Sequence, residues 1–164
     1  MAVTTHITER LTAIDPKAAP VTGAGIVTVN RDTTIPSGTA AGQADLVTKV
    51  SLTVAGSGNL DWDARAAIQA GSGAACNGAE LAYLRVEVPS SASGNVTVKV
   101  AGSNGLDILN GSTDGIVLTA GARFTLDFTT AVGPAMDASN RLINFANAGA
   151  SDVVVTIVCL QRSA

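Results

Sequence analysis

The run AELAYLRVEVPSSASGNVTVKVA (79–101) decides the fold class, because it contains two alternating segments separated by a turn. In the first segment, apolar residues occupy every second position, which is the period of a β-strand with one buried face. The face predicted to be buried holds Ala82, Leu84, Val86 and Val88. Tyr83, Arg85 and Glu87 are predicted to lie on the opposite face. The loop SSASG predicts that the strands at 79–88 and 95–101 pair with each other.

The same pattern extends over most of the chain. Strands are predicted at 46–55, 59–63, 79–88, 95–101, 106–109, 115–119, 122–129, 141–146 and 152–161, separated by turns rich in Gly, Asn and Ser. The last of them, VVVTIVCL (153–160), is apolar on both faces except at Thr156, so it is either central or covered by another subunit. Short strands at this spacing predict an all-β antiparallel sandwich, of the jelly-roll type.

The N-terminal quarter of the chain has a different character. Residues 1–44 are rich in Ala, Gly, Thr and Pro, and only the run at 26–29 is typical of a strand. Residues 2–14 combine helical spacing of apolar residues with many threonines, so their structure stays ambiguous. We therefore expect an extended N-terminal arm with one short strand at 1–44, disordered or laid across another surface, and a β-sandwich domain at 45–164.

The composition limits the classes of partner. Aromatic residues make up 3% of the chain and hydrophobic residues 46%, so small aliphatic side chains must fill the core. A core of this kind favours an oligomer, because contacts between subunits add buried area. Charged residues make up 14% of the chain, and the net charge is −3. The sequence contains no cluster of basic residues, so nucleic-acid binding is not predicted. No charged-then-apolar segment follows Met1 and no apolar run reaches about 18 residues, so we expect a protein without a leader that is made in the cytoplasm and binds no membrane.

Catalytic motifs are missing from the sequence. The single histidine, His6, lies near the N-terminus, and no serine has a glycine two residues away on each side. Pairs of glycines such as Gly56 and Gly58 lack the third glycine of a dinucleotide-binding motif, and no phosphate-binding loop occurs. We therefore expect no enzymatic activity, no catalytic residue and no cofactor.

Metal binding is also not expected. One histidine and two distant cysteines, Cys76 and Cys159, do not make a zinc site, and the two thiols are predicted to be reduced. Calcium is harder to exclude, because two groups of carboxylates contain oxygen ligands: Asp61 with Asp63, and Asp107 with Asp114. Asp residues at turns more often cap backbone groups, so we predict no metal site.

Two aromatic residues, Trp62 and Tyr83, are the only ones that we considered as platforms for a sugar ring. Trp62 is predicted to lie in the core rather than on the surface. The acids are few, and most fall in turns or on outward strand faces, so paired carboxylates for glycoside hydrolysis are not predicted.

The C-terminal third of the chain carries a resemblance to a known class of proteins. A "TAGA" turn (119–122) is followed by an aromatic-alternating strand, a Gly/Pro loop, "RLINFANAGASDV" (141–153) and a closing valine-rich strand. This order resembles the small β-sandwich proteins that decorate or cement the capsids of tailed phages, and some related head-fibre or tail components. The resemblance covers roughly residues 46–163.

The resemblance implies a function and its partners. It implies a virion structural protein, trimeric or otherwise oligomeric, that binds the major capsid protein on the outer capsid surface and braces neighbouring subunits. Residues 1–30 and the strand at 152–160 are the segments expected to be buried between subunits. The alternative is a tail or head-fibre module that binds a host glycan or receptor.

Overall fold

The computed structural model describes residues 5–14, 26–70, 72–109, 114–129 and 131–163. These residues form ten β-strands and no helix, so they include no helix that could span a membrane. The strands are β1 (Thr5–Ile14), β2 (Ile26–Ile35), β3 (Leu46–Val54), β4 (Asn59–Asp63), β5 (Glu80–Glu87), β6 (Val96–Val100), β7 (Gly115–Leu118), β8 (Arg123–Asp127), β9 (Leu142–Ala146) and β10 (Val153–Arg162). The all-β prediction is confirmed.

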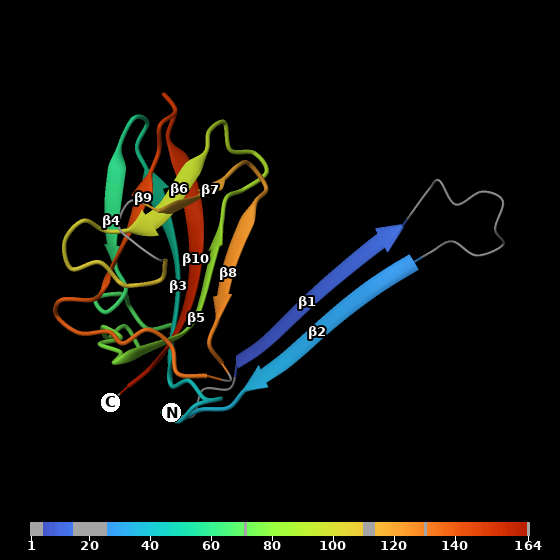
Figure 1. Ribbon diagram of the computed structural model, residues 1–164, viewed down its shortest axis with the longest axis vertical. Coiled ribbons are helices and arrows are strands. Elements are labelled where there is room, and N and C mark those ends of the chain that lie inside the picture. The colour runs from blue at the N-terminus through green and yellow to red at the C-terminus, as the bar shows by residue number, and fades with distance from the viewer. Residues whose placement is uncertain (1–4, 15–25, 71, 110–113, 130, 164) are drawn as a thin grey trace.

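Strands β3 to β10, which we call the body, form two four-stranded antiparallel sheets (Figure 1). The strand orders are β3-β10-β5-β8 and β4-β9-β6-β7. The pairs β3–β10, β4–β9, β5–β8 and β6–β7 are nested, so the first strand of the body pairs with the last and each inner strand with its counterpart. The chain of the body is therefore arranged like one long hairpin that has been divided between two sheets.

The two sheets share one hydrophobic core, which follows from the alternation of apolar residues along each strand. In β3 the alternate residues from Leu46 to Val54 face inward, while Lys49, Ser51 and Thr53 are exposed. The core is filled mainly by aliphatic side chains, among them Val54, Leu84, Val86, Val98, Ile143, Val155 and Ile157. Trp62 is 7% exposed and lies in this core, as predicted.

Two predictions about the strands were wrong. Residues 79–88 and 95–101 do not pair, because β5 pairs with β8 and β10 in one sheet and β6 pairs with β7 and β9 in the other. Their apolar faces meet across the core instead of lying side by side in one sheet. Residues 106–109 form no strand: Leu106 and Ile108 are buried in a loop that is bridged to β9 through Gly105 and Leu142. The other predicted strands of the body are confirmed within two residues at each end.

The alternation of β5 also breaks near its start. The pairing register between β5 and β10 shifts between Leu160 and Gln161. Leu81 consequently joins the main core, whereas Ala82 and Tyr83 join a second, smaller cluster. Ala82 was predicted on the core face with Leu84, and this irregularity is the physical reason for the difference.

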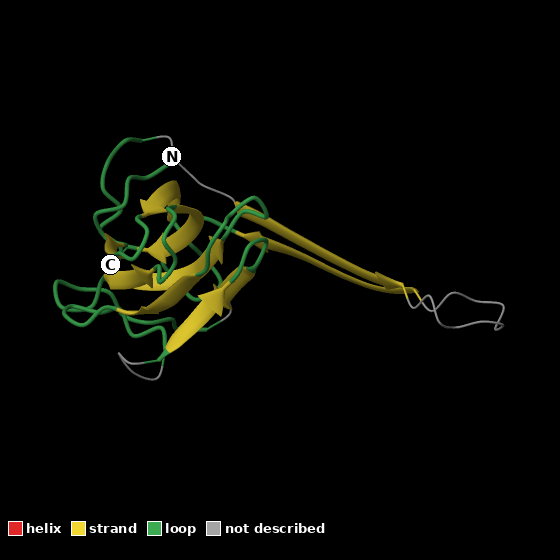
Figure 2. Ribbon diagram, turned by 90° about the horizontal axis from the view of Figure 1, so that it is seen from above, coloured by secondary structure: helices red, strands yellow, loops and turns green. Residues whose placement is uncertain are grey.

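The N-terminal region contains more strand than the sequence predicts. One short strand was expected at 26–29, but β2 spans Ile26–Ile35 and pairs with β1 over ten positions. Strands β1 and β2 pair with each other and with no other described strand. Figures 1 and 2 show this hairpin beside the two sheets, pointing away from them. We call it the N-terminal hairpin.

The base of the N-terminal hairpin packs on the outer side of the body. Ile35 and Ala44 are 1% and 2% exposed and contact Ala82, Tyr83 and Leu160. Tyr83 was predicted to face outward, and it is nevertheless buried because this segment covers it. Ile35 and Ala44, which the sequence placed in the arm, therefore pack against the sheet.

A buried arginine links the hairpin base to the body. Arg162 is 1% exposed and pairs with Glu80. Its Nε donates to the carbonyl of Gln43 (2.8 Å), and its Nη1 and Nη2 donate to the carbonyls of Ala131 (3.2 Å) and Phe128 (2.9 Å). The guanidinium is thus satisfied by three separate segments of the chain, and burial of its charge is compensated.

We expect the substitution Arg162→Met to lower the free energy of unfolding by about 3–5 kcal/mol, because it leaves the Glu80 carboxylate without its partner of opposite charge. The exposed Arg123, which also faces a carboxylate, provides the matched control: Arg123→Met should cost no more than about 1 kcal/mol. Urea denaturation of both variants measures the two values. Equal losses in the free energy of unfolding for the two variants would show that Arg162 does not stabilise the link between the hairpin base and the body.

Candidate interaction surfaces

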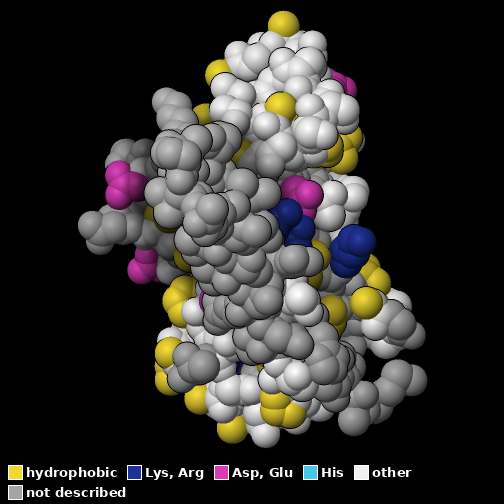
Figure 3. All heavy atoms as spheres, turned by 90° about the vertical axis from the view of Figure 1, so that its right-hand side faces the viewer, with side chains coloured by type: hydrophobic (Ala, Val, Ile, Leu, Met, Phe, Trp, Pro, Cys, Tyr) yellow, Lys and Arg dark blue, Asp and Glu magenta, His cyan; other side chains and the backbone are white. Residues whose placement is uncertain are grey.

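The outer face of the sheet β3-β10-β5-β8 is partly apolar and partly charged. On β10, Val154 is 43% exposed, and Val158 is half-buried beside the hairpin base. A hollow of about 280 Å³ lies across three of the strands and is lined by Lys49, Arg85, Glu87, Thr156 and Val158. Figure 3 shows the side of the molecule on which β8 and the hairpin lie, with basic side chains next to acidic ones and apolar side chains scattered over the surface.

The charges near this hollow compensate one another. Glu87 pairs with Arg85 and lies 3.7 Å from Arg123, measured from Oε2 to Nε. The hydrogen bond from Arg85 is the main reason that the pKa of Glu87 is lowered, so this carboxyl stays ionised at neutral pH. A carboxyl group with a lowered pKa is a poor general acid.

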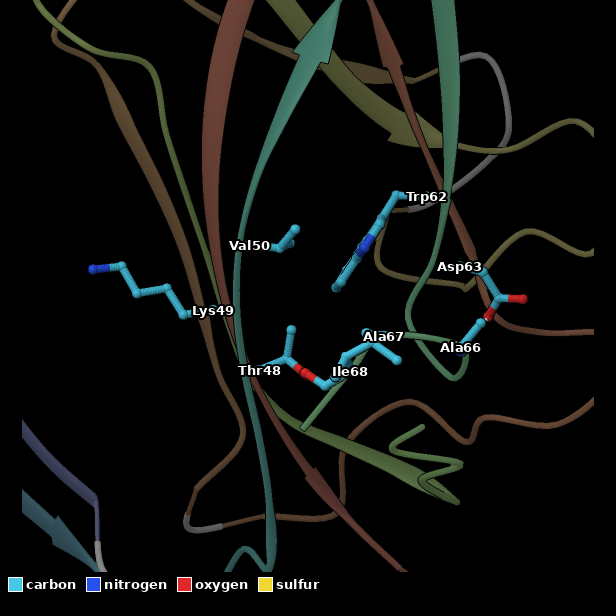
Figure 4. A pocket seen from close by; sticks show the side chains of 8 residues that line it. All are labelled: Thr48, Lys49, Val50, Trp62, Asp63, Ala66, Ala67 and Ile68. Atoms are coloured by element: carbon cyan, nitrogen blue, oxygen red, sulfur yellow. The ribbon is translucent and has the colours of Figure 1, made fainter. Parts of the chain in front are cut away.

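A second feature, a mainly apolar cavity of about 320 Å³, lies where the two sheets open between β3 and β4 (Figure 4). Each of these strands is the edge strand of its sheet. The cavity is lined by Thr48, Lys49, Val50, Trp62, Asp63, Ala66, Ala67 and Ile68. Of these, Ile68 is a large apolar side chain that is 57% exposed.

Two of the four carboxylates considered for calcium, those of Asp61 and Asp63, are engaged in local contacts. Asp61 accepts a hydrogen bond from Asn144 Nδ2 (2.6 Å), and Asp63 lies 3.3 Å from Arg141 Nη1. Asp63 Oδ1 also accepts hydrogen bonds from two backbone N–H groups of the following turn. Asp107 and Asp114 are exposed, and residues 110–113 between them lie outside the described residues. The described part of the chain contains no group of three or more His, Cys, Asp or Glu that could hold a metal ion.

Neither aromatic residue considered for sugar binding is an exposed platform. Trp62 is 7% exposed and Tyr83 is 3% exposed. His6, the only histidine, lies in β1 with Thr34 as its register partner. The sequence missed the cavity beside Trp62, because the residues that line it come from two strands and a turn that only the fold brings together.

Both cysteines are free and buried, in agreement with the prediction of reduced thiols. The Thr48 hydroxyl donates to the carbonyl of Ile68 (2.8 Å), so the thiol of Cys76 is the donor in its 3.1 Å contact with Thr48 Oγ1. Burial raises the pKa of Cys76, and complete burial raises the pKa of Cys159 to about 12. These thiols have little thiolate at neutral pH and are therefore poor nucleophiles.

No protein-family model, curated protein or solved structure matches the chain.

The raised pKa of Cys159 predicts a dependence of stability on pH. An unfolded thiol ionises from about pH 8.5, whereas the folded Cys159 stays protonated until about pH 12. Above pH 9 the unfolded state thus binds fewer protons, so we expect this group to lower the free energy of unfolding by about 1.4 kcal/mol per pH unit as the pH rises. Urea denaturation between pH 8 and 11 should show a steeper fall for the natural chain than for Cys159→Ala. Parallel curves would contradict the assignment.

Proposed function

We propose that the chain is a virion structural protein, a decoration or cement protein on the outer surface of a tailed-phage capsid. We further propose that its body is a jelly-roll sandwich and that the N-terminal hairpin is its arm. The nested pairing of eight strands in two sheets supports the jelly roll, because winding one long hairpin into two layers produces this pairing. The resemblance of residues 46–163 to capsid decoration proteins supports the function.

The N-terminal hairpin is the observation that carries the proposal. A two-stranded hairpin is marginally stable in water unless something packs against it. Strands of ten residues span roughly 33 Å, and Ile35, at the base of the hairpin, packs on the body. A structure of this length that extends away from its own core is suited to binding the surface of another chain.

The register of the hairpin indicates which of its faces would be covered. Residues two apart in a strand share a face, and register partners share it as well. Ile35 is buried against the body while its neighbour Thr34 is exposed. The alternate positions that share the face of Ile35 hold most of the apolar residues of both strands: Ile7, Leu11, Ala13, Val27 and Val29. At the centre of this face Glu9 is the register partner of Arg31.

Two kinds of chain would cover this face in the proposed assembly. One is a second copy of the protein, in a homo-oligomer for which we favour a trimer, and the other is the major capsid protein. The outer side of β10, where Val154 is exposed, would supply a further part of the subunit contacts. The entropy that is lost when the hairpin becomes ordered on a neighbouring chain is compensated by contacts that an isolated chain lacks. A glycan-binding tail module is disfavoured, since Trp62 and Tyr83 are both buried.

We expect the substitution Leu11→Asp to weaken binding to capsids of the encoding phage by at least about tenfold, because the carboxylate would lose its water at an apolar contact. Thr12→Asp introduces the same charge on the opposite face of the hairpin and should bind as the natural chain does. Co-sedimentation with purified capsids lacking the protein measures both affinities.

Light scattering of the same samples gives the solution mass. The proposal predicts a mass three times the 16.3 kDa of one chain for the natural protein. A natural chain that does not sediment with capsids, or equal losses for Leu11→Asp and Thr12→Asp, would refute the proposed role of the hairpin.

A further inference from the structure

The cavity between β3 and β4 is a feature that the proposed capsid-binding function does not use. Figure 4 shows the indole ring of Trp62 along one side of it and Val50 on the opposite side. Ala67 and Ile68, from the turn that follows β4, lie at one end. The volume of about 320 Å³ is at the lower end of the range in which proteins hold small ligands.

The walls of the cavity are fixed by hydrogen bonds in the absence of any ligand. The Thr48 hydroxyl donates to the Ile68 carbonyl (2.8 Å), and the N–H of Ala70 donates to the carbonyl of Val47 (2.7 Å). The Ala67 carbonyl accepts from the N–H of Cys76 (2.8 Å). The segment that forms one wall is thus tied to β3 and to the following loop, so little ordering would be needed when a ligand binds.

The chemistry of the walls excludes a charged ligand. The Asp63 carboxylate is occupied by Arg141 and by two backbone N–H groups, and Figure 4 shows it pointing away from Trp62. The ammonium of Lys49 also points away from the indole, on the other side of β3. The Thr48 hydroxyl uses its proton for Ile68 and accepts from Cys76. An ion in the cavity would therefore lose its water without gaining a partner of opposite charge.

We propose that this cavity binds a small, uncharged, aromatic molecule beside the ring of Trp62. An aromatic ring can pack against the indole in an offset or edge-to-face arrangement, and the aliphatic side chains of Val50, Ala67 and Ile68 line the same cavity. A saccharide fits less well, because its hydroxyl groups would find few free polar side chains on these walls. The proposal goes beyond the proposed function, and either can fail without the other.

The test uses benzyl alcohol as the probe and the single tryptophan as the reporter. Since Trp62 is the only tryptophan, the full-length protein gives one indole N–H signal in a ¹H–¹⁵N NMR spectrum. We expect benzyl alcohol to shift this signal saturably. Benzoate and benzylammonium, which have the same ring with opposite charges, should bind at least about tenfold more weakly because their charges are not compensated. Glucose should leave the signal unchanged.

The variant Ala67→Leu fills the cavity and should weaken benzyl alcohol binding at least about tenfold. Ala148→Leu makes the same change in a separate hollow on the β4-β9-β6-β7 side and should bind as the natural chain does. If Ala67→Leu does not fold, Val50→Phe tests the opposite wall. An indole signal that benzyl alcohol does not shift, a shift that survives filling of the cavity, or tighter binding of glucose or of a charged analogue would overturn the proposal.

Discussion

Pairing between β3 and β10 is the constraint on which the rest of the structure depends. These strands pair over nine positions, from Leu46 with Gln161 to Val54 with Val153. Inside this pair of first and last strands, β4–β9, β5–β8 and β6–β7 follow in nested order. The same pairing brings the segment that enters β3 next to the segment that leaves β10. Arg162 at the end of β10 can therefore reach the carbonyl of Gln43 and join the hairpin base to the body.

Buried polar side chains also support this arrangement. Gln161 is fully buried, and its amide donates to the carbonyl of Ala64 (2.7 Å) while its oxygen accepts from the N–H of Gly78 (3.1 Å). A Cβ at Gly78 would collide with the Gln161 side chain, so this close approach requires glycine. Asn147 similarly links the carbonyls of Val54 and Ser151 at the other end of the body. A core with few aromatic residues thus gains specificity from satisfied polar contacts.

The sequence was sufficient to predict the fold class and most strands of the body, because each strand carries its own two-residue alternation. It was insufficient to predict which strands pair. The alternation in β5 and β6 indicates which face of each strand is buried, but it does not indicate which strand lies next to it in the sheet. It also missed β1, in which threonines and spaced apolar residues give no single period. The burial of Tyr83 and the cavity beside Trp62 depend on segments distant in sequence. No local pattern contains that information.

The central claim is that the N-terminal hairpin is a binding element whose stability comes from another chain. Amide hydrogen exchange, measured for the purified protein at low concentration and again bound to capsids, tests this claim most directly. The account predicts that residues 5–14 and 26–35 exchange rapidly in the free chain and become protected when it is bound, while β10 is protected in both states. Hairpin amides that are as protected as those of β10 in the free chain, or that gain no protection on capsids, would contradict it.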